Sequence, residues 1–253
     1  MKILTVSFIA GFLLLSSSSY AAIPPQKKME QLHKQALQAL KIRRTKLRNL
    51  ALKEIPDQQR LELLNEIAFN KGQSISMRWR ALTSMGMIEG KKAQPHIEKA
   101  VRSEQWYMKN AGIVAMAHAN KNSAVEWAKR LLTDRALLVR TAAVQTLKKL
   151  KATSSESDLW KSLYAKQNYK RGQSLWVRRH IVETLAEIAQ PGRESNFIQV
   201  LKDPDRSLVK PAIQGLERIT NKKLGESGAN LMEKQRLWLQ WWQKKQRQPK
   251  SGR

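Results

Sequence analysis

The stretch Val139–Leu150 reads VRTAAVQTLKKL, and it decides the fold class. Apolar or small residues at its first, fifth, ninth and twelfth positions fall on one side of a helix with 3.6 residues per turn. The pattern therefore predicts an amphipathic helix with a thin, closely packing face. The same pattern returns in Met77–Ile88, Met108–Ala119, Val177–Ile188 and Leu208–Ile219. Because the five starts, at 77, 108, 139, 177 and 208, are 31, 31, 38 and 31 residues apart, they indicate an internal repeat.

A second apolar pattern precedes each of these helices. In three units, apolar residues lie 11 and 7 positions before the start, and the other two fit with a three-residue shift or an insertion of about seven residues. The paired positions are Leu63 and Ile67, Ile97 and Val101, Ala128 and Leu132, Leu159 and Leu163, and Phe197 and Leu201. Each unit is then a first and a second helix, antiparallel and joined by a short turn. A period of this length predicts an all-α fold, an α-solenoid of about five helix pairs over residues 58–220.

The repeat resembles the HEAT-like repeats of bacterial proteins, the group that includes the phycobilisome-lyase type. The turn Leu201–Leu208 (LKDPDRSL), leading into a helix like Val139–Leu150, carries the resemblance, which covers about Gln58–Thr220. It implies a stack of helix pairs. It implies less about function, because such arrays serve as scaffolds, adaptors, a few DNA-repair enzymes and bilin lyases.

Residues 1–21 (MKILTVSFIAGFLLLSSSSYA) are predicted to be a cleavable signal peptide. A lysine precedes the apolar run Ile3–Leu15, and the small residues Ser19 and Ala21 suit a cut after Ala21. The alternative is a membrane anchor, but the run is shorter than the roughly 20 residues that cross a bilayer. We therefore expect a periplasmic or secreted protein, with no transmembrane segment after signal cleavage.

Residues 22–57 are predicted to form an N-terminal cap. Gln26–Lys53 reads as one long helix, and Ile55-Pro56-Asp57 ends it because the residue before a proline avoids helical geometry. Its apolar positions, which we expect to be buried, are Met29, Leu32, Ala36, Leu40, Leu47 and Leu50. Its polar positions, read as a solvated capping face or else a polyanion-binding face, are Lys34, Lys41, Arg43, Arg44, Lys46 and Arg48.

Residues 221–246 are predicted to form the C-terminal cap. The glycine-bearing loop Gly225–Gly228 leads into an amphipathic helix, Leu231–Lys245, which carries three tryptophans. We expect this helix to pack on the last repeat. The alternative is a helix at a membrane interface, since tryptophan with flanking lysine and arginine suits lipid headgroups. A basic tail, residues 247–253, follows.

The chain is strongly basic, with 47 lysines and arginines against 20 aspartates and glutamates, a formal net charge of +27. Such a charge implies attraction to polyanions or acidic surfaces that weakens as salt rises. The second helices usually line the concave, binding side of such arrays. Their outward positions here are mostly basic: Arg80, Lys148, Lys149, Arg179, His180 and Lys210.

One basic position recurs just after the start of four second helices: Arg78, Lys109, Arg140 and Arg178. In HEAT-like repeats this residue commonly pairs with acidic residues of neighbouring turns, which implies a structural ladder. The acidic residues placed for such pairs are Glu104, Asp134, Asp203 and Asp205. The alternative is a groove of free cations aimed at a ligand.

The insertion in the 38-residue unit adds a further candidate site, comprising Lys166, Tyr169, Lys170 and Arg171. Insertions in solenoids lie on loops and often carry binding specificity. A tyrosine among cations suits stacking on a base, a sugar or a side chain. The alternative is a neutral lengthening of a surface loop.

No recognisable catalytic constellation is present in the sequence. The four histidines stand alone, without a metal-binding spacing, and there is no cysteine, nucleophile elbow or glycine-rich phosphate loop. We therefore expect no enzyme activity, cofactor or metal. The favoured function is an exported scaffold or adaptor, monomeric on its own, that binds an acidic protein partner or envelope complex. The alternative is a general polyanion binder for nucleic acid, lipopolysaccharide or anionic lipid.

Overall fold

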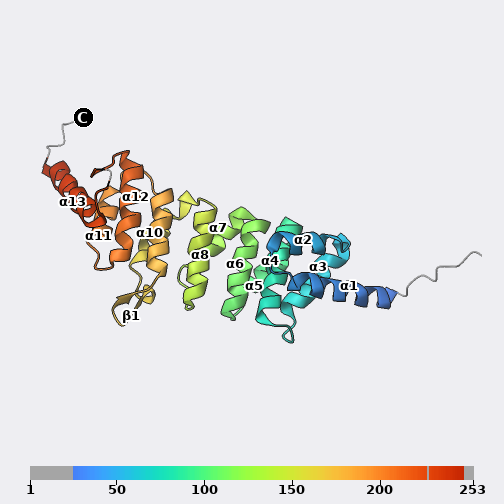
Figure 1. Cartoon of the computed structure of the whole chain (residues 1–253). Helices are drawn as coiled ribbons and strands as arrows, with labels where there is room; N and C mark the ends of the chain where they lie inside the picture. The colour runs from blue at the N-terminus through green and yellow to red at the C-terminus, as the bar shows by residue number, and fades with distance from the viewer. Residues whose placement is uncertain (1–24, 227, 248–253) are drawn as a thin grey trace, which may run out of the picture.

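The computed structural model describes residues 25–226 and 228–247, and within them the fold is all-α (Figure 1). The helices are α1 (Pro25–Lys41), α2 (Thr45–Lys53), α3 (Asp57–Phe69), α4 (Ile75–Glu89), α5 (Gln94–Val101), α6 (Trp106–Ala119), α7 (Lys121–Leu131), α8 (Leu137–Lys149), α9 (Glu156–Leu163), α10 (Val177–Ile188), α11 (Glu194–Leu201), α12 (Val209–Thr220) and α13 (Leu231–Arg247). A short hairpin pairs β1 (Tyr169–Lys170) with β2 (Gln173–Ser174). The predicted signal peptide, residues 1–21, lies outside the described residues, as does the tail from 248 onwards.

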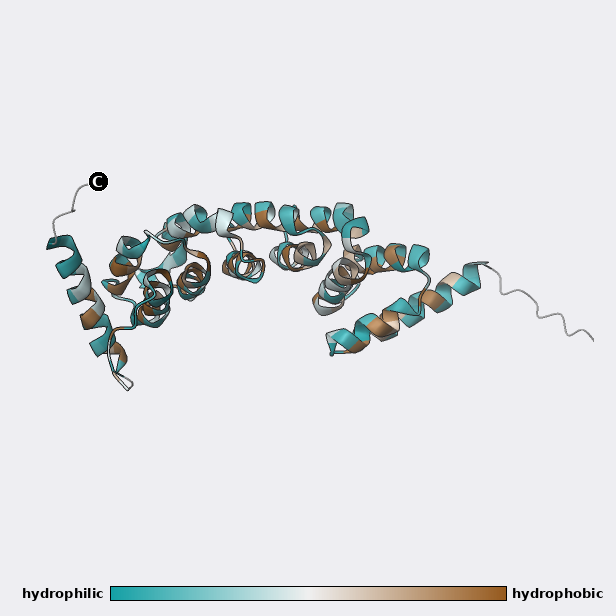
Figure 2. Cartoon of the chain, turned by 90° about the horizontal axis from the view of Figure 1, so that it is seen from above, coloured by the Kyte–Doolittle hydropathy of each residue, from teal (hydrophilic) through white to brown (hydrophobic). Residues whose placement is uncertain are grey.

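Five helix pairs follow one another along the chain: α3 with α4, α5 with α6, α7 with α8, α9 with α10 and α11 with α12. The second helices, α4, α6, α8, α10 and α12, also pack on one another in sequence and stand upright side by side in Figure 1. Seen from above, the chain forms a shallow arc, and these helices are seen end-on along its inner side (Figure 2). The inner side of the arc is therefore built from second helices.

The core lies between the two rows of helices. All ten apolar positions predicted for the first helices are buried, the most exposed of them, Leu63 and Leu132, at 2%. Ala36 and Leu40 of α1 and Leu52 of α2 continue this core at its N-terminal end. At the other end, α13 packs on α11 and α12 and contributes Trp238, which is fully buried. Burial of apolar area of this kind is the main term that holds such a stack together.

The prediction of one long N-terminal helix is wrong. The chain breaks between α1 and α2, and Arg48, predicted to face solvent, is only 2% exposed. Its guanidinium donates hydrogen bonds to the carbonyls of Ile42 and Arg43 in the break and to Ser84 Oγ on α4. Leu47 and Leu50 of α2, predicted to be buried, are 49% and 52% exposed, and Met29 of α1, also predicted to be buried, is 37% exposed.

The second helices approach each other closely at small residues. A Cβ atom on Gly86 of α4 would lie 2.4 Å from the carbonyl oxygen of Ala115 on α6, well inside van der Waals contact. Because that neighbour is backbone, the two helices would have to move apart to admit a methyl group. The small residues Gly86 and Ala115 therefore set the distance between α4 and α6.

We predict that Gly86→Ala destabilises the protein by about 1–3 kcal/mol, the usual cost of overpacking a tight contact. The change would otherwise favour the helix by up to about 1 kcal/mol, since alanine has the higher helix propensity. Urea unfolding followed by circular dichroism measures the free energy of unfolding. Gln145→Ala, at an exposed position of α8, serves as the control. A stabilised Gly86→Ala protein would show that α4 and α6 do not pack at this distance.

Candidate binding face

A hollow of about 580 Å³ lies on the inner side of the array, where α8, α10 and α12 meet. It brings together three of the predicted binding residues, Lys148, Arg179 and Lys210, each from a different helix. Arg218, Glu183 and Glu187 also line it. The basic positions of three successive repeats thus form one site, which we call the basic hollow.

The charges of the basic hollow are partly paired. Lys148 Nζ lies 3.0 Å from a carboxylate oxygen of Glu187, and Arg179 Nε lies 2.9 Å from Glu183. Lys210 is exposed and makes no ion pair or side-chain hydrogen bond with the described residues. With Arg218, four cations face two carboxylates, so the hollow keeps a net positive charge. Two carboxylates thus neutralise part of a face whose outward positions are mostly basic in the sequence.

Glu183 holds the two cations of its own helix in place. It accepts hydrogen bonds from Arg179 Nε at 2.9 Å and from His180 Nδ1 at 3.1 Å. Burial alone would raise the pKa of the Glu183 carboxyl, but these hydrogen bonds outweigh it and lower the pKa below its ordinary value. The carboxylate is therefore ionised at neutral pH.

Sequence reasoning missed Glu183, Glu187 and Arg218, although a signal for them was present. Glu183 stands four residues after Arg179 on one helix, the spacing at which opposite charges pair. Arg218 occupies the same repeat position as Lys149, ten residues after the repeat starts at 208 and 139. What the sequence did not give is the pairing of Glu187 with Lys148 of the preceding second helix.

The other predicted binding residues lie outside the basic hollow. Arg80 donates to the carbonyls of Leu40 and Lys41 and so closes the end of α1. Lys149 Nζ lies 2.9 Å from His118 Nε2, and burial, with the charge of Lys149, lowers the pKa of that histidine. Both residues thus have partners within the array.

The predicted insertion forms the hairpin of β1 and β2, and its tyrosine points into the structure. The guanidinium carbon of Arg178 lies 4.5 Å from the centre of the Tyr169 ring. Tyr169 is therefore half-buried against the ladder and is not a free stacking platform. Lys166, Lys170 and Arg171 remain exposed.

The predicted ladder of basic residues is present, but only half of it is ionic. Lys109 Nζ lies 2.6 Å from Asp134, and Arg178 Nη2 lies 2.5 Å from Asp203. The Arg178 side chain is 1% exposed and also donates to the Leu163 carbonyl at 2.9 Å. These two rungs match the expected pairing between neighbouring turns.

The other two rungs are bound by neutral acceptors, which corrects the prediction that they pair with carboxylates. Arg78 donates to the Ala68 carbonyl at 2.9 Å and to the Tyr107 hydroxyl at 2.7 Å. Arg140 donates to Asn168 Oδ1 at 2.8 Å and to the Asp134 carbonyl at 2.7 Å. Because a buried guanidinium needs its hydrogen bonds satisfied, backbone and amide oxygens serve where no carboxylate reaches.

The two remaining acidic residues predicted for the ladder have other partners. Glu104 lies 3.8 Å from Arg135, and both side chains are largely exposed. Asp205 accepts a hydrogen bond from the Ser207 amide and so caps the turn before α12. Neither contributes a rung, since only Asp134 and Asp203 contact a ladder residue through their carboxylates.

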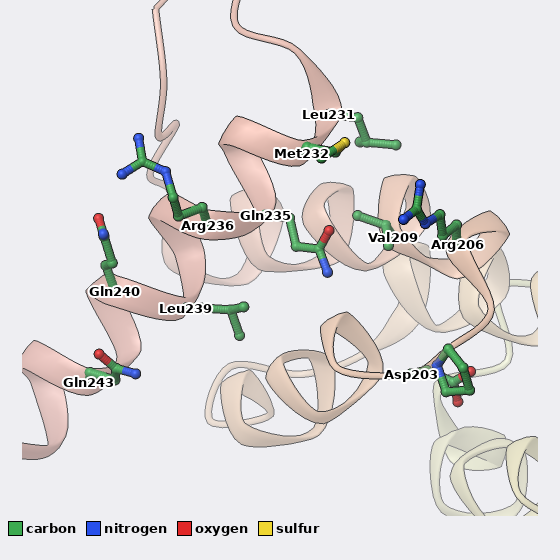
Figure 3. A pocket seen from close by; sticks show the side chains of 11 residues that line it. Asp203, Arg206, Val209, Leu231, Met232, Gln235, Arg236, Leu239, Gln240 and Gln243 are labelled. Carbon is green, nitrogen blue, oxygen red and sulfur yellow. The ribbon is translucent and has the colours of Figure 1, made fainter.

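A larger hollow, about 810 Å³, lies between α13 and the turn after α11 (Figure 3). Val209, Leu231 and Leu239 give it an apolar lining, and Arg206 and Arg236 stand at its rim. It contains none of the predicted binding residues. The charged hollow and this apolar one are therefore separate features.

Within the described residues, no three histidine, aspartate or glutamate side chains gather as a metal site would require. In the same part of the chain, no helix has both the length and the apolar character needed to cross a membrane.

Neither a known family model nor a curated protein matches this sequence. Among solved structures, the crystal structure of an engineered protein is similar over 77% of this chain and 97% of its own, with 16% identity and a TM-score of 0.49. A likeness at this level carries no argument about function. The function must therefore be argued from the site itself.

We predict that Asp203→Ala lowers the free energy of unfolding by about 3–5 kcal/mol, because it leaves the buried Arg178 without its carboxylate. Asp203→Asn can keep the hydrogen bond from the Asp205 amide. It therefore distinguishes the effect of losing the charge from the effect of losing the hydrogen bond in the turn. The matched control, Glu104→Ala, removes a carboxylate whose partner is exposed and should change little. Urea unfolding measures all three. If Asp203→Ala and Glu104→Ala lower the free energy of unfolding by equal, small amounts, the structural role of the ladder is contradicted.

The lowered pKa of Glu183 predicts a pH-dependent contribution to stability. A depressed folded-state pKa gives stability that is present above the unfolded pKa, about 4.3, and is lost as pH falls through the folded value. Glu183→Gln should therefore be less stable than wild type at pH 6, and the difference should shrink at pH 3. Urea titrations at the two pH values measure it. A difference that is constant with pH would show that Glu183 acts through packing alone.

Proposed function

We propose that this protein is an exported, non-catalytic adaptor that binds an acidic partner protein through the inner side of its array. On this proposal, residues 58–220 are an α-solenoid of five HEAT-like helix pairs, and residues 1–21 direct export. The observation that carries the proposal is the basic hollow, where cations from three successive second helices converge on one exposed surface. Four cations against two carboxylates suit a ligand that brings its own negative charges.

The basic residues of the ladder and those of the basic hollow have different roles in this proposal. Lys109, Arg140 and Arg178 are committed to acceptors inside the stack and are not free to meet a ligand. Lys210, by contrast, points from the inner side without a partner among the described residues. The basic residues thus fall into a structural set and an exposed set, and the exposed set is the one proposed to bind.

The partly paired state of the hollow favours a specific protein partner. Arg179 and Lys148 already pair with Glu183 and Glu187 in the free protein, so these pairs favour one arrangement of the charges before binding. Fixed charges pay less side-chain entropy on binding, and they discriminate between partners by the arrangement of their charges. A general polyanion binder needs only charge density, with no such arrangement.

The second candidate is a general polyanion binder for nucleic acid, lipopolysaccharide or anionic lipid. The observation in its favour is the net charge of +27, which extends far beyond the basic hollow. On that reading, affinity would follow the number of cations wherever they stand. The two functions therefore differ in whether position matters.

We predict that Lys148→Glu, Arg179→Glu and Lys210→Glu together abolish partner retention. The matched control makes the same charge change elsewhere: Lys121→Glu on α7, Lys161→Glu on α9 and Lys244→Glu on α13, all at exposed positions. Lys245 is avoided because it lies 3.6 Å from Glu194 and against Trp241. Each protein is immobilised, exposed to envelope extract, and washed with rising salt, and circular dichroism checks folding.

The adaptor proposal expects one protein in stoichiometric amount, retained through moderate salt by wild type and control but lost from the inner-side variant. Equal losses from the two variants, with nucleic acid, lipopolysaccharide or lipid eluting smoothly with salt, would establish the general polyanion binder instead.

A further inference from the structure

Four of the large apolar side chains that remain exposed lie one or two residues before the repeat starts at 77, 108, 139 and 177. Each stands at the entrance to a second helix: Ile75 at α4, Trp106 at α6, Leu138 at α8 and Trp176 at α10. Their exposed fractions are 51%, 46%, 43% and 55%. We call these four residues the apolar stripe. Scattered apolar residues are normal on a surface, but one at the entrance to each of four successive second helices is not a random scatter.

Hydrogen bonds between neighbouring second helices place these residues in a continuous row. Trp79 Nε1 donates to Asn110 Oδ1 at 3.1 Å, and Asn110 Nδ2 donates to the Leu138 carbonyl at 3.2 Å. Trp176 Nε1 donates to Thr141 Oγ1 at 3.0 Å, so its ring lies against α8. Ile75 stands four residues before Trp79 on α4, and Trp106 stands four residues before Asn110 on α6. Each pair therefore shares one face of its helix.

The row is also continuous with the basic hollow. Arg179, which lines the hollow, stands three residues after Trp176 and therefore one turn further along the same face of α10. The loops leading into the second helices add exposed cations, Arg135 before α8 and Lys170 and Arg171 before α10. An occupant of the stripe thus meets positive charge on both sides, and the complementary occupant is acidic as well as apolar.

The spacing of the stripe selects the conformation of its occupant. Packed helices lie about 8–10 Å apart, so successive members of the stripe repeat at about that distance. A polyproline-II segment advances about 3.1 Å per residue with three residues per turn, and so presents every third side chain on one face about 9 Å apart. An α-helix advances 5.4 Å per turn, so its side chains on one face recur at about 5.4 Å or, every second turn, at about 10.8 Å, and both distances lie outside the range of about 8–10 Å.

We propose that the apolar stripe is a docking track for an extended, acidic segment of the partner protein that carries an apolar side chain at every third residue. This inference rests on the proposed adaptor function and specifies the chemistry of the partner. Each apolar side chain packs against one member of the stripe, and the acidic residues between them face the cations of the loops and of the basic hollow. Such a segment needs no fold of its own.

Two fluorescent peptides of about twelve residues, enough for four polyproline-II turns, test the proposal. Both contain the same leucines, aspartates, prolines and serines. One has leucine at every third position, and the other has the leucines in adjacent pairs. Fluorescence anisotropy with the full chain measures their affinities. The test variant, Trp106→Ser with Leu138→Ser, is matched by Leu50→Ser with Met232→Ser, which removes two exposed apolar side chains away from the stripe.

We expect the period-three peptide to bind wild type and the matched control about tenfold more tightly than the permuted peptide. The stripe variant should bind both peptides equally weakly, with its thermal unfolding midpoint unchanged. Equal binding of the two peptides to wild type would overturn the proposal, as would equal losses in the stripe variant and its control. If the wild-type protein binds phosphatidylglycerol vesicles but neither peptide, the proposal is overturned and the stripe binds a lipid surface instead.

The reversal of Lys148, Arg179 and Lys210 separates this inference from the function on which it rests. If both peptides bind wild type equally and that reversal abolishes binding, the stripe fails and the basic adaptor face stands. If the period-three peptide still binds the reversed protein and loses its affinity in the stripe variant, the track stands and the basic hollow is not its anchor.

Discussion

The buried guanidinium groups of Arg78, Arg140 and Arg178 are the interaction on which the stack of helix pairs depends. Each one binds backbone carbonyls within its own pair and a polar group of the next pair. The last carbonyls of a helix have no partner within the helix, and a buried guanidinium supplies the donors that they lack. Because a charge buried without its partners is costly, any slip of one pair against the next is penalised at every such rung. Between α4 and α6, small residues then allow a close approach, as Gly86 does against Ala115.

The helices and the core of this protein could be read from the sequence because they follow from periodicity alone. The same spacing that defines Val139–Leu150 predicts the five second helices, and the upstream apolar pairs predict the buried face of the first helices. The break between α1 and α2 could not be read in this way. Periodicity treats Arg48 as one more polar residue, whereas its burial depends on Ser84, a residue 36 positions away that it meets only after folding.

The charge pairs of the candidate site were likewise not predictable from periodicity. Arg179 and Lys210 line one hollow because they stand at the same repeat position, two residues after the starts at 177 and 208, and Lys148, nine residues after its own start, joins them. Repeat positions do not say which of these cations is already paired, since that depends on side chains from adjacent helices, such as Glu187 against Lys148. The inner side is therefore uneven along its length. Toward α4 and α6 it carries Trp79, Asn110 and Val114, and toward α10 and α12 it becomes charged. A partner that follows this face would meet apolar contacts at one end and positive charge at the other.

Hydrogen exchange of the protein with its captured partner bound tests the central claim most directly, because it maps the contact surface without any substitution. If the inner side is the binding face, the amides gaining protection should lie in the first turns of α6, α8 and α10, in the loops before them, and at the start of α12 beside Lys210. The outer helices α5, α7 and α9 should exchange as in the free protein. Protection confined to those outer helices, or to the end of α13, would contradict the account, because the partner would then bind where neither the basic hollow nor the apolar stripe can reach it.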